Sequence, residues 1–424
     1  MPFQVYKLQK FLTYPELAFK WAFFEPFIWS GNRHRHQPTA WYYIKHCICI
    51  CGLFALVGQI LALICNLYMP HTTPEAEAYE NSESKVFEAT ALICYFSCCF
   101  YKMWNIFWRR KDIGPLLEKF NELFPSVVIQ KKLAEANDYK TELKRGSGGY
   151  YRFAYFEEKS RARMRFMTKY FAFAYFYYNI IPILQLIYEI LSPNHTVTYK
   201  TQSNAWFPWH NHNNHSTFVG FVFNYLVQAS AEFVGINFIM CGEYLFGFFN
   251  TQMQLHFDYL AIALETLDAT APDAMKQLKM LISYHANLLR LFNEINSLFN
   301  ITFALDLINA TFAISLMGLA MVMIEFGRAV MFSAGFSFFL ILSYVFCKNG
   351  DEFTDVSNKL SSALFYSNWY DGSLEYRRMI IFFIMRTNKP CEYQAYGYTA
   401  ISMVTYMRML KLSYQLFTSF RAIE

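Results

Sequence analysis

The sequence predicts an all-α membrane protein with seven transmembrane helices, a cytosolic amino terminus and an extracellular carboxyl terminus. Composition is the first reason: of the 424 residues, 55% are hydrophobic, 20% aromatic and only 16% charged. Soluble domains usually carry about a quarter charged residues. The second reason is that the apolar residues form seven long runs, and a run of about 20 apolar residues crosses a bilayer as a helix. The third is that Lys and Arg fall on alternate connecting segments.

The seven runs predict one membrane domain that spans the whole chain, residues 1–424. We expect the spans, in order, at His46–Met69, Phe87–Trp108, Tyr170–Leu191, Thr217–Phe249, Phe299–Ile324, Ala329–Phe346 and Ala395–Phe420. The fourth run is longer than a bilayer requires, so we expect its end to project into the cytosol. The segment before the first span lacks the apolar region and cleavage site of a signal peptide. Its lysine and aromatic residues are typical of a segment that lies in the membrane interface.

The positive charges predict the orientation. The segments before the first span and between the second and third are rich in Lys and Arg, whereas the alternate segments hold only Lys85, Lys200, Arg328 and Arg421. Because cytosolic segments carry the excess of positive charge, we expect the amino terminus inside. Seven crossings then place the carboxyl terminus outside, which is the reverse of a G-protein-coupled receptor.

Two helices are expected to continue spans four and five below the membrane, at Met253–Leu267 and Ala274–Leu298. The second carries an apolar stripe with helical spacing that includes Leu278, Leu281 and Leu288. Such a surface suits contact between subunits, and it equally suits packing within one subunit.

The loop between spans three and four contains two N-glycosylation sequons, at Asn194 and Asn214, and both fall outside in the predicted orientation. His210, His212 and His215 lie in the same loop, but no acidic or cysteine ligands accompany them, so we expect no metal site. The ten cysteines show neither a disulfide framework nor a zinc spacing, and they are interpreted as unpaired structural thiols.

The last span has the most unusual chemistry. Thr405, Arg408, Lys411, Gln415 and Ser419 recur at spacings of three or four and form one polar stripe. Such a stripe is costly against lipid, so it is expected to face water or the protein interior. The first alternative is a pore-lining face. The second is a buried stripe in which Arg408 pairs with Glu232, Glu243 or Asp306. Four identical copies would place a ring of Arg408 in a cation pore, which favours either a heteromer or a wide, wet vestibule.

Aromatic and methionine side chains are concentrated in the outer halves of spans two to six. An apolar pocket with a few hydroxyl groups suits a small volatile or lipid-like ligand, although ordinary helix packing explains many of these residues equally well. Pro182 is expected to kink span three and open space beside Ile181. The candidate ligand-binding residues are Tyr95, Tyr177, Tyr178, Ile181, Phe223, Met321, Phe332 and Phe336.

Motifs of enzymes are absent from the sequence. It contains no glycine-rich phosphate loop, no paired-histidine motif on a helix and no nucleophile elbow. We therefore expect neither catalysis nor a cofactor, and no nucleic-acid partner. Membrane lipid and a small apolar volatile ligand are the expected contacts.

Several blocks near the carboxyl terminus resemble the insect odorant receptor family. They are Cys347-Lys348-Asn349-Gly350-Asp351-Glu352, Tyr366-Ser367-Asn368-Trp369-Tyr370, the span through Lys411-Leu412-Ser413-Tyr414, and the stretch from Leu281 to Leu289. The resemblance implies an odorant-gated, non-selective cation channel in the plasma membrane of olfactory neuron dendrites. It further implies a heterotetramer with an odorant co-receptor. The subunits would meet through residues 251–298 and 348–394, and residues 395–424 would carry the pore helix.

The same resemblance assigns a role to this chain within the channel. It lacks the long insertion before span five that marks the co-receptor, so it resembles a ligand-tuning subunit. Its pore residues would be Arg408, Lys411, Gln415, Ser419 and Ile423. Three alternatives stay open at this point: a gustatory receptor channel of the same superfamily, a G-protein-coupled receptor, and a transporter, for which inverted repeats are missing.

Overall fold

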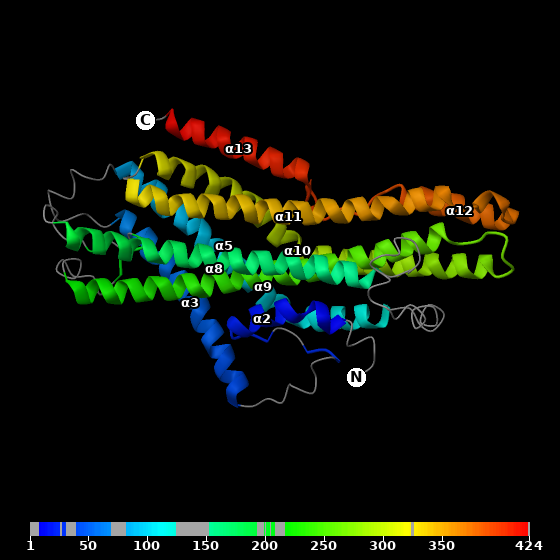
Figure 1. The fold of residues 1–424 in the computed structure, drawn as a ribbon, viewed down its shortest axis with the longest axis horizontal. Coiled ribbons are helices and arrows are strands. Elements are labelled where there is room, and N and C mark those ends of the chain that lie inside the picture. The colour runs from blue at the N-terminus through cyan, green and yellow to red at the C-terminus, as the bar shows by residue number, and fades with distance from the viewer. Residues whose placement is uncertain are drawn as a thin grey trace.

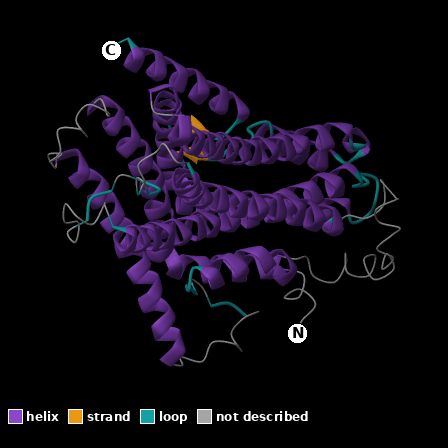
Figure 2. Ribbon diagram, turned by 60° about the vertical axis from the view of Figure 1, so that its left-hand side comes forward, coloured by secondary structure: helices purple, strands orange, loops and turns teal. Residues whose placement is uncertain are grey.

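The computed structural model describes residues 8–25, 28–30, 40–68, 82–123, 152–192, 199, 201–203, 205–207, 217–323 and 326–422. Nearly all of these residues are helical (Figures 1 and 2). In chain order the helices are α2 (Thr13–Trp21), α3 (Ala40–Tyr68), α5 (Ser82–Leu123), α8 (Phe153–Leu191), α9 (Phe218–Glu265), α10 (Ala274–Met323), α11 (Phe326–Tyr366), α12 (Leu374–Thr387) and α13 (Met403–Arg421). A short 3₁₀ helix, η3 (Trp369–Asp371), precedes α12, and strands β1 (Gln394–Ala395) and β2 (Thr399–Ala400) precede α13.

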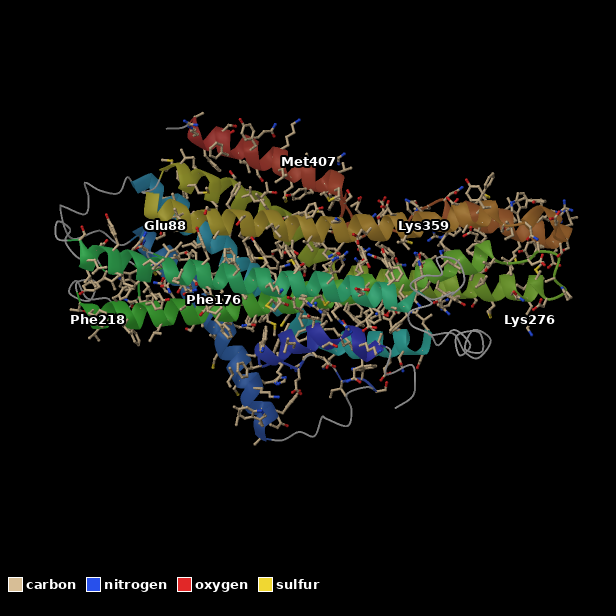
Figure 3. The ribbon with its side chains drawn as sticks, viewed as in Figure 1. Glu88, Phe176, Phe218, Lys276, Lys359 and Met407 are labelled. Atoms are coloured by element: carbon tan, nitrogen blue, oxygen red, sulfur yellow. The ribbon has the colours of Figure 1, made fainter. Side chains whose placement is uncertain are left out.

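The helices form an elongated bundle. α8, α9, α10 and α11 run along its longest axis, and α5 packs against α9 and α10 (Figure 1). α13 lies along one side, where it contacts α10 and α11, whereas α2 and α3 lie on the opposite side. Phe218 and Lys276 mark the two ends of the bundle (Figure 3). The halves that contain them are termed the Phe218 half and the Lys276 half.

Six helices are long and apolar enough to cross a membrane, namely α3, α5, α8, α9, α10 and α11. Each of the first six predicted spans lies within one of them, apart from single end residues. α9 has 48 residues and α10 has 50. At 1.5 Å per residue, α10 is about 75 Å long, more than twice the ~30 Å hydrocarbon core. The helices predicted at Met253–Leu267 and Ala274–Leu298 are therefore continuations of two spans, as expected. α8 passes through Pro182 as one helix.

The last helix begins at Met403, eight residues later than the predicted start at Ala395. The reason is the antiparallel β1–β2 hairpin, in which Gln394 pairs with Ala400. Tyr396 and Gly397 turn the chain with φ values of 50° and 77°, which a helix does not allow. The Ser402 hydroxyl then accepts a hydrogen bond from the Thr405 amide at 3.3 Å and caps α13.

The packing of α9 differs along its length. Phe218, Val219, Phe223 and Leu226 near its start are exposed, whereas the described side chains from Gly235 to Leu264 are buried almost without a break. A helix that is apolar and buried on every side occupies the centre of a core. α9 is therefore the central element of the Lys276 half, where α2, α5, α8, α10 and α11 surround it.

Candidate functional site

An apolar cavity of about 60 Å³ lies between five helices of the Phe218 half. Ala174, Ala334 and Gly335 leave the space because their side chains are small. At Gly335 a Cβ atom would lie 2.8 Å from the Met317 sulfur, so α11 approaches α10 closely at this point. The lining residues are Leu92, Tyr95 and Phe96 from α5, Ala174, Tyr175 and Tyr178 from α8, Glu232 and Ile236 from α9, Met317 from α10, and Ala334, Gly335 and Phe338 from α11.

Two of the predicted ligand-binding residues, Tyr95 and Tyr178, line this cavity. The other six lie elsewhere in the same half. Tyr177 donates a hydrogen bond to the Val330 carbonyl oxygen at 3.1 Å, and Phe223 is 53% exposed on the surface of α9. Ile181 and Met321 are half-buried, Phe332 is buried, and Phe336 packs beside Gly318.

Glu232 is the lining residue that sequence reasoning missed as a site residue. It lies in a long apolar run, and an ionisable side chain in such a run indicates a functional position. Its Oε2 accepts a hydrogen bond from Asn179 Nδ2 at 2.7 Å. The amide Nε2 of Gln202 donates to Asn179 Oδ1 at 2.9 Å, and the Tyr178 hydroxyl donates to the Gln202 carbonyl oxygen at 2.9 Å. This polar network joins α8 and α9 to the segment before α9.

The segment around Gln202 and Ser203 is buried between helices at the Phe218 end. Gln228 Oε1 accepts hydrogen bonds from the amide and the hydroxyl of Ser203, at 2.9 and 3.0 Å. Gln59 of α3 donates to the same hydroxyl at 3.3 Å, and the Trp206 amide donates to the Ala62 carbonyl oxygen at 3.0 Å. These contacts hold the segment across α3, α8 and α9. The predicted glycosylation sites Asn194 and Asn214, and the three histidines of this loop, lie outside the described residues.

A buried ionic cluster lies below the cavity, where α5, α9 and α10 meet. The Lys102 ammonium, 2% exposed, contacts Glu243 at 2.8 Å and Asp306 at 2.7 Å. The Tyr101 hydroxyl donates to the other oxygen of Asp306 at 2.6 Å. Lys102 and Asn179, and not Arg408, are therefore the partners of these three carboxyl groups. Arg408 itself is exposed and pairs with none of them in the described part of the chain, so this alternative is wrong.

α13 presents two different faces. Thr405, Met409 and Ser413 are buried against the bundle, and the Ser413 hydroxyl donates to the Thr311 carbonyl oxygen of α10 at 3.1 Å. Four members of the predicted polar stripe are exposed in this chain, namely Arg408, Lys411, Gln415 and Ser419, and their place in a pore stays a prediction. Thr405 is an exception: its hydroxyl turns inward and donates to the Ala400 carbonyl oxygen at 2.6 Å. Ile423 lies outside the described residues.

The motif around Asn349-Gly350 on α11 contacts α8, α9 and the hairpin before α13. The Asn349 side-chain oxygen accepts a hydrogen bond from Arg163, and the Asn349 backbone carbonyl oxygen accepts one from the Asn250 side chain at 3.0 Å. Glu352 contacts both Arg163 and Lys159. Gly350 is required because a Cβ atom there would lie 2.2 Å from the Ile401 carbonyl oxygen. The motif thus holds the hairpin and the start of α13 against α11.

The second motif, around Asn368, joins the turn between α9 and α10 to the turn between α11 and α12 at the Lys276 end. Asn368 donates to Asp268 at 2.9 Å and accepts from the Ala269 amide at 2.9 Å. The hydrogen bonds from Asn368 and Thr270 lower the pKa of the Asp268 carboxyl. Nearby α12 exposes Ile381, Phe382 and Met385. An exposed apolar surface of this kind is typical of a protein contact.

The cysteines serve packing in this structure. All ten are free thiols, and six of them are buried. Burial raises the pKa of Cys391, beside the hairpin, to about 11, so this thiol stays protonated at neutral pH. No group of three metal-ligating side chains occurs among the residues described.

The fold defines a multi-pass helical membrane protein with an apolar cavity inside its bundle. Residues 84–414 match the model of a family described as 7tm Odorant receptor, and the chain belongs to this family. The prediction of an all-helical fold with seven spans and of an insect odorant receptor is thereby confirmed. The matched relatives are named as odorant receptors.

Relatives and solved structures agree with this assignment. The chain is 29% identical over 423 residues to putative odorant receptor 69a, isoform A, of Drosophila melanogaster, and the match covers 99% of this chain and 100% of the relative. Isoform B is 30% identical, with the same coverage. The insect olfactory receptor OR5 from Machilis hrabei, solved in complex with eugenol, has a TM-score of 0.75 at 14% identity and covers 99% of this chain and 100% of its own. That likeness shows the fold alone.

Proposed function

We propose that this chain is the ligand-tuning subunit of an odorant-gated, non-selective cation channel, and that the cavity in the Phe218 half binds a small volatile. The observation that carries the proposal is the apolar cavity between five helices in a member of an odorant receptor family. Apolar cavities with a few convergent polar groups are the usual sites for small ligands. In the proposed orientation the Phe218 half faces outward and the Lys276 half faces the cytosol.

Binding would have to expand this cavity. Its volume of about 60 Å³ is below that of the engineered cavity of about 150 Å³ that binds benzene. An odorant therefore favours a conformation in which the five helices move apart. A ligand shifts an equilibrium by its differential affinity for two states, so stronger binding to the expanded state drives the change.

α10 is the element through which expansion would reach the pore. Met317 lines the cavity, and the next residue, Gly318, faces Phe417 of α13. At Gly318 a Cβ atom would lie 3.7 Å from the Phe417 ring. One turn of α10 thus contacts both the ligand site and the proposed pore helix, whose exposed face carries Arg408, Lys411, Gln415 and Ser419.

The exposed face of α13 supports assembly with other subunits. Polar side chains on a membrane helix require water or polar partners, which neighbouring pore helices around an aqueous path would supply. Two cations on this face favour a heterotetramer with an odorant co-receptor, because fewer copies of Arg408 and Lys411 then face permeating cations. Residues 251–298 and 348–394 would form the cytosolic subunit contacts.

The decisive experiment records odour-evoked current with and without a co-expressed co-receptor. We expect current only from the pair, and robust current from this chain alone would contradict the heteromer. Ala334→Leu should abolish the response while leaving surface expression intact, because the added side chain fills the cavity. Ala40→Leu, the same substitution at an exposed position at the start of α3, is the matched control.

A charge reversal tests the pore face. Arg408→Glu should raise the permeability ratio of Ca²⁺ to Na⁺, because it replaces a positive charge beside the path with a negative one. Arg165→Glu, the same substitution at an exposed position on α8, should leave that ratio unchanged. Equal ratios for wild type and Arg408→Glu would exclude Arg408 from the path.

A further inference from the structure

Glu232 is the one carboxyl group among the described residues that line the cavity, and its residue is only 6% exposed. The neighbouring side chains are aromatic, aliphatic or small. A polar group in such surroundings is costly unless it is hydrogen-bonded, and it discriminates strongly between ligands that do and do not satisfy it.

One oxygen of this carboxyl group is already used. Oε2 accepts the hydrogen bond from Asn179, which Gln202 and the polar network hold in place. Oε1 accepts no hydrogen bond from any described residue, and Glu232 forms no ion pair within the described part of the chain. The carboxyl group is therefore held in a fixed orientation with an acceptor oxygen left over.

The hydroxyl groups of the cavity tyrosines are differently occupied. The Tyr178 hydroxyl donates to the Gln202 carbonyl oxygen at 2.9 Å, and the Tyr175 hydroxyl donates to the Ala229 carbonyl oxygen at 3.4 Å. Both donors are thus directed at the backbone and away from a ligand. Tyr95 lines the cavity as well, and its hydroxyl group can either donate or accept. Glu232 Oε1 is the acceptor oxygen left over from the polar network, and its ionised form binds only a head that donates.

We infer that the cavity is selective for hydroxyl-bearing odorants, that is, alcohols or phenols with an apolar body, and that Glu232 is the specificity-determining residue. This inference rests on the proposed function of the cavity. A hydroxyl group both donates and accepts, so it pairs with the carboxyl group in either protonation state, whereas an ether oxygen only accepts and pairs with the neutral form alone. Ethers and hydrocarbons have no such donor. An ammonium group is a donor as well, but it loses far more solvation on entering an apolar cavity than a hydroxyl group does.

The test compares each alcohol of a panel with its own methyl ether, using octanol, cyclohexanol and phenol on the receptor co-expressed with a co-receptor. For the alcohols that evoke current, we expect a half-maximal concentration at least about tenfold below that of the ether, because the ether leaves Oε1 unpaired. Glu232→Leu should reduce this ratio to near one. Glu232→Gln should lower it as well, because the amide oxygen takes the hydrogen bond from Asn179 and the NH2 group, a donor, then faces the ligand in place of Oε1. Ile236→Leu, a change in the apolar wall, should shift alcohol and ether equally.

Two results would overturn the inference: an alcohol-to-ether ratio near one in the wild type, or an unchanged ratio in Glu232→Leu. Surface labelling identifies any variant that does not reach the membrane, and Glu232→Met then replaces Glu232→Leu. Absence of current for every compound from a complex present at the surface would instead refute the proposed function. The two failures are thus distinguishable.

Discussion

The two halves of the bundle differ in how side chains fill the space between the helices. In the Lys276 half, an aromatic cluster fills the space between α9, α10, α11 and the residue that precedes β1. Its members are Phe246, Phe257, Phe292, Phe299, Phe303, Phe346, Phe353 and Tyr393, with ring centroids of contacting pairs 4.9 to 6.0 Å apart. In the Phe218 half, alanine and glycine leave a cavity between the helices.

Because of this difference, one helix can be rigid in the Lys276 half and able to move in the Phe218 half. α9 and α10 run through both halves, so each is held firmly at one end and lines a compressible space at the other. Well-packed interiors transmit strain because they yield little. A ligand that expands the cavity would therefore move the helices of the Phe218 half about a fixed Lys276 half, and α13 contacts α10 on the moving side through Thr311 and Gly318.

The largest effect is expected at the boundary between the halves. Lys102→Met removes the cation between Glu243 and Asp306 and leaves two carboxylates buried without it. Breaking a buried ion pair costs about 3–5 kcal/mol. We expect a large loss of thermal stability, measured on detergent-solubilised receptor by fluorescence-detected size exclusion.

The control for this change neutralises all three residues. Lys102→Met combined with Glu243→Gln and Asp306→Asn should recover much of the lost stability, because neutral polar groups cost less to bury than charges. If Lys102→Met alone unfolds at the wild-type temperature, the ionic cluster does not stabilise the structure, and it does not mark the boundary between the two halves.

Paired truncations compare the two halves directly. Phe353→Ala opens a cavity inside the aromatic cluster and should cost about 3–5 kcal/mol. Phe338→Ala should cost less, because one side of Phe338 already faces the cavity and has fewer contacts to lose. Phe338→Ala should in addition shift the preferred odorants towards larger molecules. Equal losses of thermal stability from both substitutions would contradict the difference in packing.

A pair of glycine substitutions tests the tight packing at the hairpin. In Gly350→Ala the new Cβ would lie 2.2 Å from the Ile401 carbonyl oxygen, and because that atom belongs to the backbone, α11 and the hairpin must separate. We expect a cost of about 1–3 kcal/mol. Gly58→Ala on α3 meets nothing within 4 Å and should be neutral or stabilising. Thermal shifts of the two variants in one direction would refute this account of Gly350.

The sequence predicted the long helices of this structure better than the contacts between distant segments. Apolar runs identified six spans and the helical continuations of α9 and α10, because hydrophobic length and periodicity are local properties of the chain. The start of α13 was missed because the hairpin depends on the backbone of Tyr396 and Gly397 and on the close contact with Gly350. Hydropathy does not report such contacts.

The lining of the cavity was predictable only in part, for a geometric reason. Tyr177 and Tyr178 are adjacent in sequence, yet only Tyr178 reaches the cavity. Neighbouring positions on a helix point about 100° apart, and which of them faces inward depends on helices distant in the sequence. Glu232 was considered only as one of three possible partners of Arg408, because its actual partner Asn179 lies on α8, 53 residues away in the sequence.

The smallest effect is expected from an ion pair on the surface of the well-packed half, which separates packing from charge. Lys119 and Glu294 contact each other at 2.5 Å, but their side chains are 49% and 43% exposed. Water screens such a pair, so Lys119→Ala should cost less than about 1 kcal/mol. The thermal shift should be a small fraction of that of Lys102→Met, although each substitution removes one lysine from one ion pair or cluster. A comparable shift would mean that surface charge, and not the buried aromatic and ionic contacts, holds the Lys276 half rigid.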